Sequence, residues 1–199
     1  MPGSIVDLSL PGSSVPDPIV VDTNIIAEYL LASFFVPTVF ALRASQFFND
    51  LIANNGTGVV TPTAFTEFVH VAVRVKYNQE FARMTVFERK FKYGYPVKNW
   101  AGLYKQDPTI LRAFLPDLHT LRNLLIANGL LFVAPEELGS IASGRRHDEE
   151  IVDLMGAYGL DSSDAAILLE ARRCGLTDII GFDADMQRAQ PDFNIYTWI

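Results

Sequence analysis

The stretch Ile19-Val20-Val21-Asp22-Thr23-Asn24 decides the fold, because three apolar β-branched residues run directly into an acid, a hydroxyl and an amide. A continuous apolar run of this kind is typical of a strand that is buried on both faces of a parallel sheet. Asp22 then stands at the carboxyl end of that strand, where open α/β sheets bind their ligands. The stretch predicts an α/β fold whose ligand site begins at Asp22.

Strand-like and helix-like segments alternate along most of the chain. Short apolar runs at about residues 59–60, 130–133, 178–182 and 193–198 predict further strands, and apolar residues at helical spacing lie between them. This order predicts a central, mostly parallel sheet with helices on both faces. We expect Asn24 to cap the first helix, Pro37 to lie in the first turn of the second, and Pro116 to kink or split a helix over residues 107–128.

The composition fits one domain of ordinary size. Of 199 residues, 49% are apolar and 20% charged, so a sizeable core can form. The single cysteine, Cys174, excludes an intramolecular disulfide and a cysteine-based zinc cluster, and a reducing, cytoplasmic compartment fits best. We interpret residues 1–18 as a flexible tail without the basic start of a secretory signal, and residues 19–199 as a single domain. No apolar stretch reaches the roughly 20 residues that span a bilayer, so no membrane partner is expected.

Positive charge is concentrated in the middle of the chain. The formal net charge is −7, yet residues 74–105 hold eight basic and two acidic side chains, which gives +6 there and leaves −13 for the remainder. We expect a basic, mostly helical insertion at about residues 77–134. Either its cations contact RNA phosphates while its aromatics stack on unpaired bases, or the cations lie in solvent and the aromatics form a core or a dimer interface. The candidate RNA contacts are Arg74, Lys76, Arg83, Arg89, Lys90 and Lys92.

Three further acids lie at the ends of predicted elements. Glu67 and Asp164 lie in the first turns of predicted helices, and Asp183 follows a predicted strand. Clustered carboxylates repel one another unless a cation neutralises them, so the joint pattern with Asp22 predicts a metal site. Oxygen ligands without nearby Cys or His favour Mg²⁺ or Mn²⁺, ions that activate water and stabilise the transition state of phosphodiester cleavage.

Each acid taken singly also has a structural explanation. Asp22 and Asp161 fit the N-cap position of a helix, whereas Asp183 and Asp185 fit a turn. Glu67 fits an exposed helix surface. These structural roles stay open beside the metal site.

Four short motifs in this order resemble the PIN domain. They are Val20-Val21-Asp22-Thr23-Asn24, Thr61-Pro62 with Glu67 shortly after, Asp161-Ser-Ser-Asp164-Ala-Ala-Ile-Leu-Leu and Gly181-Phe-Asp183-Ala-Asp185-Met; the ending Phe193-Asn-Ile-Tyr-Thr-Trp198 is also similar. The resemblance covers about residues 19–77 and 150–199. It implies a PIN-like three-layer α/β/α sandwich, with the basic segment as a helical insertion, and an endoribonuclease that cleaves RNA with Mg²⁺ or Mn²⁺.

The resemblance also implies roles for individual residues. It assigns metal binding and catalysis to a quartet of acids: Asp22, Glu67, Asp164 and Asp183. Asp161 and Asp185 would be outer metal ligands, and Thr23 or Asn24 would orient a water or a phosphate.

Many members of that family are VapC-type toxins of toxin–antitoxin pairs. RNA, an antitoxin protein and a second copy of the chain are therefore the expected partners, although the basic middle is longer than a compact toxin needs. The main alternative is a PIN-like module that binds RNA or protein without cutting. A phosphatase-like hydrolase fits less well, because Asn24 stands where an aspartyl-phosphate mechanism usually has a second acid.

Overall fold

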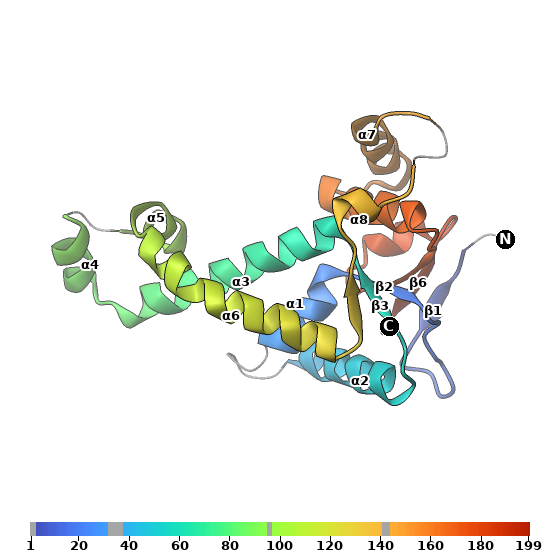
Figure 1. The fold of residues 1–199 in the computed structure, drawn as a ribbon, viewed down its shortest axis with the longest axis horizontal. Coiled ribbons are helices and arrows are strands. Elements are labelled where there is room, and N and C mark those ends of the chain that lie inside the picture. Colours follow the sequence, from blue (N-terminus) through green and yellow to red (C-terminus); the bar gives the residue numbers. More distant parts are fainter. Residues whose placement is uncertain (1–2, 32–37, 95–96, 141–143) are drawn as a thin grey trace. The chain divides into compact units, whose positions relative to one another are not determined.

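The computed structural model describes residues 3–31, 38–94, 97–140 and 144–199. Its central feature is a parallel sheet with the strand order β1-β6-β5-β2-β3-β4 (Figure 1). The strands are β1 (Ile5–Asp7), β2 (Ile19–Val21), β3 (Gly58–Val60), β4 (Leu130–Phe132), β5 (Asp178–Ile180) and β6 (Asn194–Thr197). Every neighbouring pair is parallel, which confirms the predicted α/β class.

The chain forms two compact units. The sheet unit comprises Met1–Phe68 and Leu125–Ile199, and the helical unit comprises Val69–Leu124. The predicted basic insertion overlaps the helical unit, but its last strand, β4, pairs with β3 and belongs to the sheet unit.

Helices cover both faces of the sheet. α1 (Thr23–Leu31) packs against α2 (Val39–Ala53), and α7 (His147–Tyr158) packs against α8 (Ser162–Arg173). In Figure 1 these two pairs lie on opposite sides of the strands, which gives the expected three layers. β2 is fully buried between them, because its three apolar side chains meet a helix layer on either face. Two short 3₁₀ turns, η2 (Pro135–Glu137) and η3 (Met186–Ala189), complete the connections.

Within residues 3–18, the structure has a strand in part of the segment that we expected to be a flexible tail. Ile5–Asp7 form strand β1, which pairs in parallel with β6 in the register Ile5↔Ile195. The Leu8 amide donates to the Thr197 carbonyl oxygen at 2.7 Å. The mostly apolar segment 5–8 therefore pairs with the edge of β6, which would otherwise be unpaired.

The expected cap of the first helix differs from the structure, and of the two effects expected of Pro116 the split does not occur. α1 begins at Thr23, so Asn24 lies in its first turn and is not its cap. Pro116 lies inside α6 (Pro108–Ala127) without splitting that helix. Pro37 falls outside the described residues.

The helical unit has its own small core. It contains most of α3 (Pro62–Arg83) and α6, together with α4 (Val86–Tyr93) and α5 (Trp100–Gln106). Tyr77 is fully buried there beside Val97 and Leu103. Its hydroxyl donates to the Asp107 carbonyl oxygen at 2.8 Å and accepts from the Leu111 amide at 3.2 Å, which ties α3 to the start of α6. Within the described chain, no helix is long and apolar enough to cross a membrane.

Candidate functional site

Asp22 lies where the strand order of the sheet reverses. From β2 the chain continues to β3 and β4 on one side, whereas β5 and β6 lie on the other. Val21 pairs with Ile180, so the segments that follow β2 and β5 lie next to each other at the same edge of the sheet. The Asp22 amide donates to the Ile180 carbonyl oxygen at 3.0 Å. The crevice at such a reversal is the usual ligand site of an open parallel sheet.

The backbone after β5 is held directly against Asp22. The Phe182 amide donates to Asn24 Oδ1 at 3.1 Å. Gly181 passes so close that a Cβ atom there would lie 3.1 Å from Asp22 Oδ2, a tighter approach than side chains normally allow. The glycine and the amide together hold the backbone after β5 against Asp22, and the charge of Asp183, two residues after Gly181, contributes to the raised pKa of the Asp22 carboxyl group.

Glu67 is joined to the same edge through Thr23. Thr23 Oγ1 donates to Glu67 Oε2 at 2.8 Å and shares its proton with the Ala64 carbonyl oxygen at 3.2 Å. Thr23 is itself buried, with an exposed fraction of 8%. The first turns of α1 and α3 are therefore in contact, and the Glu67 side chain is oriented by a hydroxyl of the motif after β2.

Asp164 enters from the first turn of α8. Asp161 caps this helix, and its Oδ1 accepts from the Ser163 and Asp164 amides at 2.8 and 2.9 Å. Asp161 thus has the predicted capping role, whereas Asp164 accepts none of these cap bonds and is half-buried. Capping explains Asp161 but not Asp164.

Asp183 and Asp185 form the turn after β5. Asp183 Oδ1 accepts from the Asp185 amide at 2.8 Å, as in an Asx turn. Asp185 Oδ1 lies 2.6 Å from Arg188 Nη2 in an exposed ion pair. Asp185 is thereby paired with a cation of its own turn, whereas Asp183 has no ion pair with the described residues, and the charges of both acids raise the pKa of Asp164.

Glu170 is a buried acid that we did not predict from the sequence. Its carboxylate, on α8 and only 4% exposed, accepts from the Thr63 amide at 3.0 Å and from Thr63 Oγ1 at 2.8 Å. A carboxylate is favourable at this position, because the first amides of α3 have no partner within the helix. Glu170 thus joins α8, which carries Asp164, to α3, which carries Glu67. The available signal was a charged residue in the otherwise apolar run 165–171.

Burial and the neighbouring acids raise the pKa values of two of the carboxyl groups. Burial, followed by the charge of Asp164 and the smaller effects of Glu67 and Asp183, raises the pKa of Asp22 to about 8, while the hydrogen bond from the Thr23 amide opposes the shift. Burial, followed by the charges of Asp161 and Asp183, raises the pKa of Asp164 to about 7. Asp22, Asp164, Glu67 and Asp183 therefore interact as one negatively charged cluster.

The cluster has the donor chemistry of a divalent-cation site. None of its four carboxylates takes part in an ion pair with the described residues. Among these residues, the Asp22 carboxylate accepts a single hydrogen bond, which the Thr23 amide donates. All the donors are oxygens, as Mg²⁺ and Mn²⁺ prefer. In the described part of the chain, however, no three His, Cys, Asp or Glu side chains stand close enough together to hold one ion as they are placed.

Most of the proposed RNA contacts of the helical unit are already used within the protein. Lys76 and Arg83 both pair with Glu80, at 3.0 and 2.9 Å. Arg89 donates to backbone carbonyl oxygens and lies over the Phe81 ring, and Lys92 pairs with Asp107 at 2.8 Å. The side chains of the other two candidates, Arg74 and Lys90, are exposed and have no such partner among the described residues.

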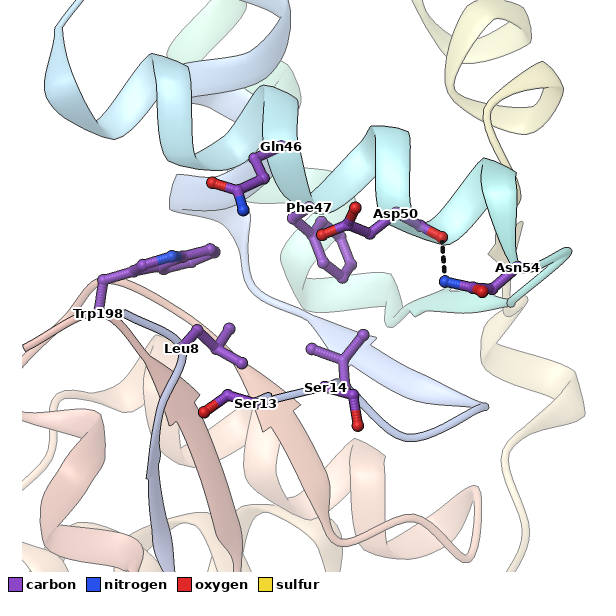
Figure 2. A pocket seen from close by; sticks show the side chains of 9 residues that line it. Leu8, Ser13, Ser14, Gln46, Phe47, Asp50, Asn54 and Trp198 are labelled. Carbon is purple, nitrogen blue, oxygen red and sulfur yellow. Dashed lines mark hydrogen bonds between the residues drawn. The ribbon is translucent and has the colours of Figure 1, made fainter. Parts of the chain in front are cut away.

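A separate pocket of about 300 Å³ lies in the sheet unit between the N-terminal segment and α2 (Figure 2). Its wall includes Leu8, Phe47, Asp50 and Trp198, and it contains none of the candidate acids. It is therefore not part of the cluster around Asp22.

No protein-family model and no curated protein matches the chain. Among solved structures, the chain is similar to that in the crystal structure of PAE2754 from Pyrobaculum aerophilum, with 15% sequence identity and a TM-score of 0.41. The superposition covers 96% of this chain and 90% of that one. A likeness at this level carries no argument about function.

Proposed function

We propose that the protein is a divalent-metal-dependent endoribonuclease of the PIN type. One observation carries this proposal: at the reversal of the strand order, burial of Asp22 and the charges of acids from three other elements raise the pKa of Asp22 to about 8. A group of carboxylates around a buried Asp22 costs stability unless a cation neutralises it, which is the usual signature of a functional site.

Asp22, Glu67, Asp164 and Asp183 would hold Mg²⁺ or Mn²⁺. Such an ion, when bound, supplies a water of lowered pKa and stabilises negative charge on the phosphodiester. Since these four side chains do not converge on one point, binding requires that they move closer together. Thr23 fixes the orientation of Glu67 through its 2.8 Å hydrogen bond.

Asn24 has two roles in this proposal. Its Oδ1 positions the backbone before Asp183 by accepting from the Phe182 amide. Its Nδ2 has no acceptor among the described residues and is the group that we assign to a phosphate oxygen of the RNA. Asp161 and Asp185 act through the protein, as a helix cap and as a partner of Arg188.

The toxin role, an antitoxin partner and a homodimer belong to the same proposal and rest on the resemblance of the four motifs to the PIN domain. The unpaired cations Arg74 and Lys90 are the residues of the original set that are available to RNA phosphates.

A PIN-like module that binds RNA or protein without cutting is the second candidate. It is favoured by the structural use of three of the six acids, since Asp161, Asp183 and Asp185 each make a local cap, turn or ion-pair contact. In that case the acids after β2 and β5 shape the fold and no metal is bound.

Cleavage of a single-stranded RNA of mixed sequence in Mn²⁺, Mg²⁺ or EDTA separates the two candidates. The nuclease cuts only with metal, and Asp22→Asn, Asp164→Asn and Glu67→Gln each lower the rate by at least about a hundredfold. Asp117→Asn, at an exposed position of α6, is the matched control and leaves the rate unchanged. RNA binding without cleavage under every metal condition would favour the binding module.

A further inference from the structure

The helical unit contains an open apolar groove of about 670 Å³ that none of the candidate acids lines. Its walls come from α3, α5 and α6, which Figure 1 shows in green to yellow. The groove lies entirely within residues 69–124, so it is a feature of one compact unit.

The apolar side chains of the groove are arranged in helical stripes. Val69 and Val73 lie one turn apart on α3, and Leu111, Leu115 and Leu118 follow the i, i+4, i+7 spacing on α6. Leu115 is 47% exposed, although it is a large apolar residue. Two neighbouring stripes of this spacing form the kind of surface into which a third amphipathic helix packs.

α5 lines the groove with two aromatic side chains. Trp100 and Tyr104 both line it, and Tyr104 is 44% exposed while its ring packs edge-on against buried Tyr77. Aromatic side chains that are partly exposed but fixed by packing are favourable binding anchors, because little conformational entropy is lost when they are covered.

Two unpaired cations stand among these apolar residues. Arg74 and Lys105 line the groove, and both side chains are exposed without an ion pair or hydrogen bond to the described residues. The lining includes no Asp or Glu. Elsewhere in the unit, Lys76, Arg83 and Lys92 are paired with acids, whereas Lys90 and Lys98 are exposed without an ion pair to the described residues.

The groove is preformed, since a buried network fixes the helices around it. Asp107, between α5 and α6, is 6% exposed and accepts from Lys92 Nζ at 2.8 Å, Tyr93 Oη at 2.7 Å and the Thr109 hydroxyl. Tyr77 joins α3 to the same point. A partner can therefore bind without first ordering these helices.

We propose that this groove binds an amphipathic helix of a partner protein, whose apolar face packs on the leucine and valine stripes and whose acidic side chains pair with Arg74 and Lys105. The net charge of the unit, +6 over residues 69–124, favours an acidic partner. An RNA base is a poorer fit, because aliphatic side chains dominate the walls and His70, Arg74, Trp100, Tyr104 and Lys105 are the lining residues with polar side-chain groups.

Trp100 provides a direct readout of binding in the groove. The chain has two tryptophans, and Trp198 lies in the sheet unit, so Trp198→Phe leaves Trp100 as the single reporter. The probes are three synthetic helical peptides with one shared leucine face and with glutamate, glutamine or lysine on the flanks. We expect the glutamate peptide to shift the Trp100 emission and to bind at least about tenfold more tightly than the lysine peptide.

Substitutions in and outside the groove then test whether the peptides bind there. Arg74→Glu with Lys105→Glu weakens the glutamate peptide by at least about tenfold and strengthens the lysine peptide, whereas Lys98→Glu, at an exposed cation outside the groove, changes neither. Leu115→Asp abolishes binding of all three peptides, and circular dichroism checks that this variant is folded.

Three outcomes would overturn the proposal. They are equal affinity for the glutamate and lysine peptides, unchanged binding in Leu115→Asp, or displacement of the glutamate peptide by a single-stranded RNA that itself shifts the Trp100 emission. Because the assay needs no metal and no acid of the Asp22 cluster, its result is independent of whether the protein cleaves RNA.

Discussion

At Asp22 the fold places a carboxyl group in an environment that disfavours its ionised form. Burial and the neighbouring acids raise its pKa to about 8 from an ordinary value of 3.8. Between these pH values the folded protein binds more protons than the unfolded chain, so the free energy of unfolding falls as the pH rises from about 4 to about 8.

Asp22→Asn should therefore stabilise the metal-free protein at high pH. The amide keeps an acceptor for the Thr23 N–H but carries no charge. In urea unfolding with EDTA, we expect the variant to gain about 1–3 kcal/mol over wild type at pH 8 and little at pH 4. Asp117→Asn, at an exposed position, should show no such pH-dependent gain. An Asp22→Asn variant that is less stable than wild type at pH 8 would mean that the carboxylate is not repelled.

Gly181 makes the approach to Asp22 possible. A Cβ atom at this position would lie 3.1 Å from Asp22 Oδ2 and 3.4 Å from Asp22 Cβ. We predict that Gly181→Ala lowers the free energy of unfolding by about 1–3 kcal/mol and reduces metal-dependent cleavage, because the carboxylate must move.

Gly156→Ala is the control for Gly181→Ala. Gly156 lies in α7 with open space around the position of a Cβ atom, so alanine should be neutral or stabilising there by up to about 1 kcal/mol. Thermal unfolding and RNA cleavage of both variants measure the contrast. Similar behaviour of the two would show that the close contact at Gly181 has no consequence.

At the scale of elements, one buried acid sets how α3 and α8 meet. Glu170 accepts two hydrogen bonds from Thr63 at the start of α3. We predict that Glu170→Gln destabilises the protein by about 1–3 kcal/mol, because a charge-assisted bond to the helix start is lost. A double-mutant cycle with Thr63→Val should give a coupling energy above about 0.5 kcal/mol. Additive effects of the two changes would contradict the assigned contact.

Local patterns predicted several elements of the fold well. The apolar run before Asp22 is the buried strand β2, and Asp161 is the cap of α8 as its spacing indicates. Pairing across the chain could not be predicted in the same way. β1 forms because β6 offers it an edge nearly 190 residues away, and Glu170 is satisfied by Thr63 on another helix.

At the scale of the whole molecule, the strand order determines what the four acids can do together. Each acid was predicted from a local motif, but their meeting depends on β2 lying between β5 and β3, which a single sequence does not specify. The charge division was predicted better, since the helical unit carries +6 and the remainder −13. The partners of these cations were not predicted, because the pairing of Lys76, Arg83 and Lys92 with acids depends on tertiary contacts.

Isothermal titration calorimetry with Mn²⁺ tests the central claim most directly. We predict binding that is abolished by Asp22→Asn, is unchanged in Asp185→Asn because Asp185 pairs with Arg188, and tightens from about pH 6 to pH 8. At pH 7 the ion should also release protons, since the pKa values of Asp22 and Asp164 lie at about 8 and about 7. No binding at any of these pH values, or equal binding by Asp22→Asn, would contradict a metal centre at the reversal of the sheet.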